Sequence, residues 1–115
     1  MGIKRIEAII RPEKLEPLRI LLEELKAPGM MITEIEGHGK QGGVSHQWRG
    51  SQYKTNFLPK TKVEIVVPDT QVKKLVAAIV EVCRSGAVGD GKIFVMPVSD
   101  AIRIRTKEKG DKAVK

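Results

Sequence analysis

The sequence predicts an α+β fold in which strands and helices follow the order β-α-β-β-α-β. Two amphipathic helical patterns each lie between two segments rich in aliphatic and β-branched residues. Residues 6–25 also resemble residues 63–82 at an offset of 57 positions, which indicates a doubled strand-helix-strand unit. Between the two units runs a polar stretch much longer than the usual connection of about 4 to 6 residues.

The first unit begins with IKRIEAII, residues 3–10, whose alternation and aliphatic end are typical of a strand covered on at least one face. A helix follows, because Leu15, Leu18, Leu22 and Leu25 recur on one helical face. Pro17 falls early in this helix, where a missing N–H is tolerated. The motif KAPGM ends the helix, and MITEIEGHG predicts the second strand.

The second unit repeats this order. TKVEIVVP, residues 61–68, predicts a third strand, and apolar positions from Val72 to Val82 predict a helix. KIFVMPV, residues 92–98, predicts the fourth strand. AIRIRT alternates sharply, so we expect a C-terminal strand and a charged tail over 100–115.

Two such units form the split, ferredoxin-like arrangement, in which both helices cover one face of an antiparallel sheet. Each helical pattern has a single apolar stripe, so the opposite sheet face has no cover from its own chain. An uncovered aliphatic face favours an oligomer. We therefore expect a single domain, 1–115, that associates with copies of itself and carries a protruding loop over 38–59.

The composition is that of one globular domain of 115 residues, with 41% hydrophobic and 30% charged residues. No stretch approaches the roughly 18 apolar residues of a membrane span, and the first residues alternate charged with aliphatic side chains. These features predict a cytoplasmic protein. The single cysteine, Cys83, lies on an apolar helical pattern and is expected to be a buried thiol, not a reactive one.

The net charge of +7 would suit nucleic acid, the phosphates of a nucleotide or an acidic protein partner. Basic residues are densest over 40–62 and 103–115. A ferredoxin-like RNA-binding module would stack bases on exposed sheet aromatics, for which Phe94 is the only candidate. We therefore expect no nucleic-acid partner, and we keep such a module as an alternative class of function.

The segment SGAVGDGKIF predicts an anion site. Gly89 and Gly91 on either side of Asp90 permit turn conformations in which backbone N–H groups converge on an anion. Lys92 adds a positive charge at the entrance to the fourth strand. The segment is not a P-loop, because a strand and not a helix follows Lys92. The alternative is a plain turn between helix and strand.

Two further segments fit the same chemistry. In an extended chain, Arg103 and Arg105 would project to one side and suit a polyphosphate or several carboxylates. A solvated edge strand would carry the same charges. In GHGKQGG, Lys40 offers charge and Gln41 an amide oxygen, although the glycines would equally suit a hinge.

Other chemistry is less well supported by the residues. His38 and His46 are spaced too irregularly for a metal pair. Trp48 and Tyr53, in a polar loop, are candidate anchors for a protein contact. No grouping of nucleophile, base and acid, and no paired-carboxylate motif, stands out. We therefore do not expect an enzyme.

Taken in this order, the segments IEAIIRPEKL, GM, WRGSQY, GDGKIFV and IRIRT resemble the PII signal-transduction family of nitrogen regulators. Ser85 to Val98 matches the C-terminal signature of that family fully. The resemblance covers nearly the whole chain. It implies a ferredoxin-like homotrimer whose long T-loops project from the body, with ATP or ADP in clefts between subunits.

The resemblance also implies ligand contacts. Mg²⁺ on ATP would receive 2-oxoglutarate, with the amide oxygen of Gln41 as a ligand, and hard oxygen ligands are what Mg²⁺ prefers. Contacts to 2-oxoglutarate would come from Gly39, Lys40, Gln41 and Lys60. The nucleotide contacts would be Gly37, Gly39, Lys40, Gln41, Gly89, Asp90, Gly91, Lys92, Arg103 and Arg105.

Partners and modifications follow from the same resemblance. Targets of the family include ammonium transporters and nitrogen-metabolism enzymes, so a membrane would be met only through a transporter. Contacts would come from Trp48, Arg49 and Tyr53, and Tyr53 and Ser51 match residues that are modified in some members. Two alternatives stay open beside the RNA-binding module: a PII-like regulator that answers to adenine nucleotides but not to 2-oxoglutarate, and a slow nucleotide hydrolase.

Overall fold

The computed structural model describes residues 2–37, 45–48, 51–54 and 58–115, and side chains within 2–36 and 58–115. In chain order its elements are β1 (Ile3–Ile10), a 3-10 turn (Pro12–Lys14), α1 (Leu15–Glu24), β2 (Met31–Gly37), β3 (Ser45–Trp48), β4 (Ser51–Lys54), β5 (Leu58–Pro68), α2 (Asp69–Cys83), β6 (Lys92–Val98) and a second 3-10 turn (Gly110–Ala113).

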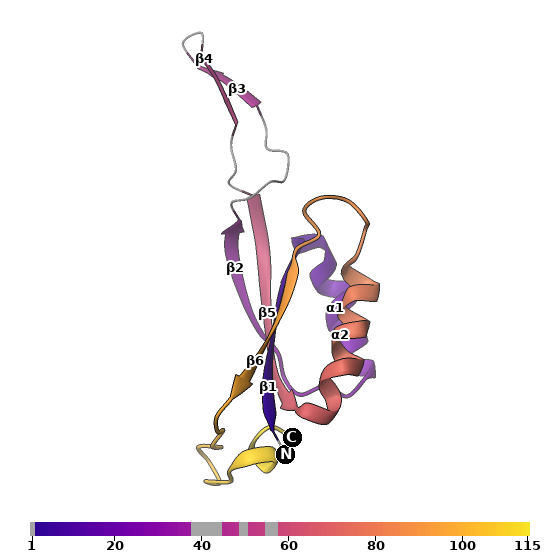
Figure 1. Ribbon diagram of the computed structural model, residues 1–115, viewed down its shortest axis with the longest axis vertical. Coiled ribbons are helices and arrows are strands. Elements are labelled where there is room, and N and C mark those ends of the chain that lie inside the picture. Colours follow the sequence, from indigo (N-terminus) through magenta and orange to yellow (C-terminus); the bar gives the residue numbers. More distant parts are fainter. Residues whose placement is uncertain (1, 38–44, 49–50, 55–57) are drawn as a thin grey trace.

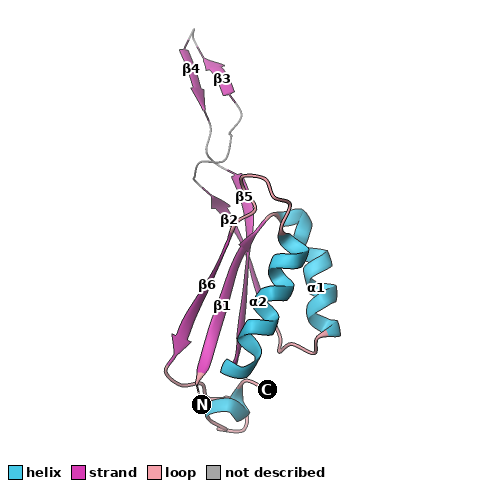
Figure 2. Ribbon diagram, turned by 45° about the vertical axis from the view of Figure 1, so that its right-hand side comes forward, coloured by secondary structure: helices cyan, strands magenta, loops and turns pink. Residues whose placement is uncertain are grey.

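Four strands form one antiparallel sheet in the order β2-β5-β1-β6. Both helices lie on the same face of this sheet (Figure 2). The two central strands, β1 and β5, each lead into a helix, as the internal repeat predicted. The α+β, ferredoxin-like arrangement expected from the sequence is therefore confirmed.

The core lies between the sheet and the helices. Alternate residues of the central strands point toward the helices, and the apolar stripes of α1 and α2 meet them. Burying each Ile, Leu or Val side chain stabilises the fold by about 1.5–3 kcal/mol. The buried cluster consists of Ile6, Ala8, Ile10, Leu18, Leu22, Val63, Ile65, Val67, Leu75, Ile79 and Cys83.

The start of α2 is fixed to the start of β1. The Asp69 carboxylate accepts the Gly2 N–H at 3.0 Å and lies 3.0 Å from the Lys4 ammonium. The hydrogen bond to Lys4 is the main reason that the pKa of Asp69 is lowered. Since α2 is anchored here, its other end places the loop that follows Cys83 beside the far end of β1 (Figure 1).

The face of the sheet away from the helices carries a charged cluster. Glu7 and Glu64 lie directly opposite each other on β1 and β5, where like charges repel. Lys62 compensates, because its Nζ lies 3.6 Å from Glu7 and 3.4 Å from Glu64. Arg5 adjoins the cluster, and its Nε is buried without a hydrogen-bond acceptor among the described residues. The two glutamates are thus members of a half-buried ion-pair cluster.

The stretch between β2 and β5 contains a short hairpin. Strands β3 and β4 pair antiparallel, and they lie beyond the ends of β2 and β5, away from the helices (Figure 1). The loop expected over 38–59 is therefore shorter at one end, because β5 begins at Leu58 and not at residue 61. Leu58 and Pro59 pair with the end of β2, which extends the ladder.

The C-terminal strand expected over 100–115 is not formed. Ile102 makes only an isolated bridge. The Arg103 N–H donates to the Glu108 carbonyl at 2.9 Å, and the Lys107 N–H donates to the Arg103 carbonyl at 2.7 Å. These local bonds turn the chain back on itself and use backbone groups that a strand ladder would need.

Candidate functional site

A glycine-rich loop, residues 84–91, joins the end of α2 to the start of β6 and forms the centre of the candidate site (Figure 1). Gly86, Gly89 and Gly91 have φ angles of +89°, +103° and +101°, a region that residues with a side chain rarely adopt. The turn conformations predicted at Gly89 and Gly91 are therefore present.

Gly91 also makes a very close approach to β1. A Cβ atom placed on Gly91 would lie 1.7 Å from the carbonyl oxygen of Ile9. Lys92, the next residue, is the register partner of Ile9 in the β1–β6 ladder. Gly91 thus brings the loop onto the sheet at a separation that only glycine permits.

The Asp90 carboxylate organises this loop from within. Its Oδ2 accepts the N–H groups of Ser85 and Gly86, each at 2.8 Å, and the Ser85 hydroxyl donates to its Oδ1. The Arg11 Nε donates to the same Oδ1 at 3.2 Å. Asp90 therefore joins the end of the loop to the residues that directly follow α2, and both of its carboxylate oxygens accept hydrogen bonds from the same chain.

These contacts give Asp90 an unusual acidity. The Ser85 hydroxyl, followed by the Gly86 and Ser85 amides, holds the pKa of Asp90 well below its ordinary value. Because the pKa is lower in the folded protein than the value of about 3.9 in an unfolded chain, the contacts stabilise the loop above that pH. Their contribution is lost as the pH falls toward the folded-state pKa.

We therefore expect the Asp90 carboxyl carbon, followed by NMR in a pH titration, to have its midpoint below about 3.9. The Ser85 and Gly86 amide resonances should shift over the same pH range, because they report the same carboxylate. An ordinary midpoint for Asp90 would contradict the arrangement. An Asp90→Asn variant is the control, since its amides should show no transition there.

Two cations hold the outer part of the loop. The Arg11 guanidinium donates to the Val88 carbonyl at 2.8 Å as well as to Asp90, and the Lys60 ammonium donates to the Gly89 carbonyl. Arg11 directly follows β1, and Lys60 lies near the start of β5. Arg11 was not predicted as a site residue. The one available signal in the sequence was the position of Arg11, directly after the first strand of one repeat. The matching strand of the other repeat also leads into a helix.

Lys60 lies mostly inside the protein, with 8% of its surface exposed. Burial, followed by the neighbouring Arg11 charge, lowers the pKa of its ammonium group. A polar recess of about 480 Å³ lies beside it, between β2, β5 and the turn after β1, with Glu34 and Glu36 on its wall. Lys60 therefore connects this recess with the glycine-rich loop.

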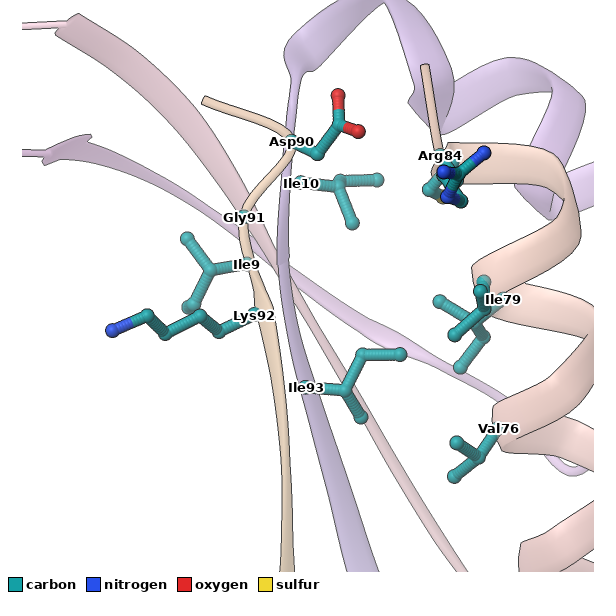
Figure 3. A pocket seen from close by; sticks show the side chains of 11 residues that line it. Ile9, Ile10, Val76, Ile79, Arg84, Asp90, Gly91, Lys92 and Ile93 are labelled. Carbon is teal, nitrogen blue, oxygen red and sulfur yellow. The ribbon is translucent and has the colours of Figure 1, made fainter. Parts of the chain in front are cut away.

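A second cavity, of about 260 Å³, lies between α2 and the adjoining ends of β1 and β6. Figure 3 shows Ile79 and Ile93 on opposite walls, whereas Lys92 projects to the other side of the strand. Cys83, also on the wall, is 5% exposed, which confirms the predicted burial, and burial raises the pKa of its thiol. The lining is mostly aliphatic, and the Lys92 ammonium points away from it.

Arg103 and Arg105 do not lie beside this loop. Strand β6 separates the two regions (Figure 1), and its seven residues correspond to roughly 20 Å. The Arg103 guanidinium is bound to its own tail, donating to the Glu108 carboxylate at 2.9 Å and to the Lys112 carbonyl at 3.1 Å. Arg105 is exposed. The prediction that both arginines project to one side of an extended segment is therefore wrong.

Residues 3–108 match the family described as Nitrogen regulatory protein P-II. The chain belongs to this P-II family. Curated relatives include Nitrogen regulatory protein P-II 2 of Methanothermobacter thermautotrophicus, 49% identical over 97% of each chain. Nitrogen regulatory protein P-II 1 of Escherichia coli is 47% identical over 97% of this chain and 100% of the relative.

A solved structure gives the same family. The crystal structure of Arabidopsis thaliana PII bound to citrate matches with a TM-score of 0.80 and 37% identity, covering 99% of this chain and 91% of that one. The PII resemblance drawn from the sequence is therefore confirmed. The chain is accordingly a member of a family of nitrogen regulatory proteins.

Several expected P-II site residues lie outside the described residues. These are Gly39, Lys40, Gln41 and Arg49. The backbones of Gly37, Trp48, Ser51 and Tyr53 lie in strands, and their side chains are outside the described set. Within the described part of this P-II chain, no helix is long and apolar enough to cross a membrane. The same part contains no cluster of three or more His, Cys, Asp or Glu side chains suited to a metal.

Proposed function

We propose that this P-II protein senses adenine nucleotides, ATP or ADP, and reports them to nitrogen-metabolism targets through the loop over 38–59. The observation that carries the proposal is the loop at 88–91. The Val88 carbonyl accepts a hydrogen bond from Arg11 and the Gly89 carbonyl one from Lys60, and Lys92 directly follows the loop. Amides and cations in this arrangement suit a polyphosphate.

The proposed contacts keep the predicted set with one change of role. Asp90 would contribute its backbone N–H, because its carboxylate is engaged with Ser85, Gly86 and Arg11. An engaged carboxylate also adds little repulsion toward a phosphate. The remaining nucleotide contacts are Gly37, Gly39, Lys40, Gln41, Gly89, Gly91, Lys92, Arg103 and Arg105.

The proposal requires more than one copy of the chain. A triphosphate cannot bridge the roughly 20 Å of β6 that separates Lys92 from the arginines, so these groups would come from neighbouring subunits. The uncovered sheet face supports association, since Phe94 is 48% and Met31 55% exposed there. We propose a homotrimer.

Mg²⁺ and 2-oxoglutarate complete the proposed ligand set. The phosphates and the Gln41 amide oxygen would hold Mg²⁺, whose contribution is to neutralise phosphate charge and to receive the keto acid. Lys60 would pair with the distal carboxylate of 2-oxoglutarate, and Gly39 and Lys40 would be further contacts to this ligand. The Arabidopsis relative bound to citrate supports a carboxylate-binding P-II site.

Output would pass through the segment that carries the β3–β4 hairpin. Trp48, Arg49 and Tyr53 would contact an ammonium transporter or a nitrogen-metabolism enzyme, and Tyr53 or Ser51 would be the modified hydroxyl. The names of the relatives, all regulatory proteins, support a regulator and not an enzyme. We propose a cytoplasmic location, with membranes met only through a transporter.

Calorimetric titration with ATP, ADP and AMP tests the proposal, each with and without Mg²⁺ and 2-oxoglutarate. We expect ATP and ADP to bind, and 2-oxoglutarate to bind only in the presence of Mg-ATP. Lys92→Ala should weaken ATP binding about 10- to 100-fold, because a hydrogen bond to a charged group contributes about 1.5–3 kcal/mol. Lys74→Ala, at an exposed position on α2, is the matched control.

The outcomes separate the alternatives. No binding of any nucleotide would overturn the proposal. Nucleotide binding without a 2-oxoglutarate response would leave an adenylate sensor, which the existing bond from Lys60 to the Gly89 carbonyl would favour. Release of phosphate that depends on Lys92 would show a hydrolase instead.

A further inference from the structure

Arg11 contacts the glycine-rich loop at two points, yet it belongs to none of the segments that suggested a ligand. Its Nε donates to Asp90 at 3.2 Å and its Nη2 to the Val88 carbonyl at 2.8 Å. The Arg11 and Asp90 side chains are 21% and 22% exposed, so the pair is partly shielded from water. An ion pair in this setting is stronger than a surface pair.

The contact at Val88 fixes the direction of the following amide. The chain has no cis peptide bond in its described part, and in a trans peptide the C=O and N–H groups point in opposite directions. With its carbonyl held by Arg11, the peptide between residues 88 and 89 must direct the Gly89 N–H away from Arg11. Arg11 therefore determines the direction in which the Gly89 N–H points.

Lys60 has the same effect one peptide further on. Its ammonium holds the Gly89 carbonyl, so the Asp90 N–H points away from Lys60. The Gly89 N–H donates no hydrogen bond within the described part of the chain, and the Asp90 N–H lies at the close of the turn formed by Val88 and Gly89. Two successive amides thus have fixed directions, and the first is free, a geometry that suits an anion.

From these contacts we propose that Arg11 is a positioning residue for the phosphate site. It holds the Val88 carbonyl and the Asp90 carboxylate together and so orients the Gly89 and Asp90 N–H groups toward the ligand. Arg11 need not touch the ligand itself. The inference rests on the proposed function, since it assumes that the amides of this loop bind phosphate.

Arginine suits this role better than lysine. A guanidinium has several N–H donors in a rigid fork and can hold two acceptors on different residues at once, as Arg11 does. A lysine ammonium at the same place would keep the charge without the fixed fork. Replacement by lysine therefore separates the effect of charge from the effect of geometry.

The test compares Arg11→Gln, Arg11→Lys and Arg19→Gln in the full chain. Arg19 is the matched control, because it also forms two ion pairs, with Glu16 and Glu23, but on the exposed side of α1. Affinities for ATP and AMP are measured by calorimetry, and amide spectra without ligand show whether the β1–β6 ladder is kept. Methylguanidinium is then added to an Arg11→Ala variant as a chemical rescue.

We expect Arg11→Gln to weaken ATP binding about tenfold, which is the effect of one net hydrogen bond to a charged group. The ratio of ATP to AMP affinity should fall, because the loss lies in the phosphate contacts. Arg11→Lys should recover part of the affinity, methylguanidinium should restore part of it to Arg11→Ala, and Arg19→Gln should bind like the wild type.

Wild-type ATP affinity in a folded Arg11→Gln variant would overturn the inference while leaving the proposed function in place. Equal weakening of ATP and AMP would also overturn it, since that pattern indicates a general loss of structure. Failure of the wild-type protein to bind ATP would instead overturn the proposed function, and the inference with it.

Discussion

Replacing Gly91 by alanine is expected to destabilise the folded protein by about 4 kcal/mol or more, which is exceptional for a single substitution. The new Cβ would lie 1.7 Å from the Ile9 carbonyl oxygen, and the φ of +101° is unfavourable for any residue with a side chain. Relief would require the start of β6 to move off β1, which breaks the ladder at Lys92. Urea unfolding followed by circular dichroism measures the loss.

Two other glycines serve as controls for this substitution. Gly110 has a φ of +68°, and a Cβ atom added to it would meet nothing within 4 Å. Gly110→Ala should therefore cost only the backbone term of about 1–2 kcal/mol. Gly29 has open space and no positive φ, so Gly29→Ala should be nearly neutral. The explanation fails if Gly91→Ala costs no more than Gly110→Ala.

Mixing two variants that each bind nucleotide weakly is expected to restore tight binding. Lys92→Ala should remove the loop contribution and Arg105→Ala the arginine contribution, and each homo-oligomer should bind ATP at least about tenfold more weakly than the wild type. Because Lys92 begins β6 and Arg105 follows the end of this strand, a complete site would take one from each of two neighbouring subunits. Arg105 is chosen over Arg103, whose guanidinium also holds the tail.

Co-refolding the two variants in equal amounts should regenerate about a quarter of the wild-type sites. The subunit that supplies the loop has an intact Lys92 with a probability of about one half, and its neighbour has an intact Arg105 with the same probability. Calorimetry gives the number of tight sites. Mixing the folded variants without refolding is the control, because slow subunit exchange should restore few sites. If the co-refolded mixture has no more tight sites than its parents, both groups act within one subunit.

The sequence predicted the elements that rest on apolar periodicity. Leu18 and Leu22 recur at helical spacing and are buried, and Ile6 and Ile65 alternate with charged residues and face the helices. A side chain that must leave water places a strong constraint on local structure, so such patterns survive folding. The internal repeat added the topology, because two equal strand-helix-strand units pack best as one sheet.

The C-terminal segment shows where this reasoning fails. Ile104 alternates with Arg103 and Arg105 as in a strand, but Ile104 is 94% exposed and buries nothing in its own chain. Local hydrogen bonds from Arg103 and Lys107 decided the conformation instead. Alternation alone does not form a strand when no neighbouring strand is available to pair with it.

The candidate site was predicted only in part for a related reason. Glycines and Lys92 are visible in the sequence because their backbone freedom and charge are local properties. Arg11 and Asp90 are 79 positions apart, and their contact depends on the tertiary fold. Asp90 was therefore predicted as a ligand contact, whereas its carboxylate is engaged inside the loop.

The tail contacts of Arg103 imply a competition for its guanidinium. An anion that binds the Nη2 atom of Arg103 must displace the carbonyls of Lys112 and Lys115, and one that binds beside Nη1 competes with the Glu108 carboxylate. The free energy of binding measured for such an anion is then the difference between the free energy of its own hydrogen bonds to Arg103 and that of the tail hydrogen bonds that it replaces. A substitution in the tail that never meets the ligand, such as Glu108→Gln, would consequently tighten binding by freeing the arginine.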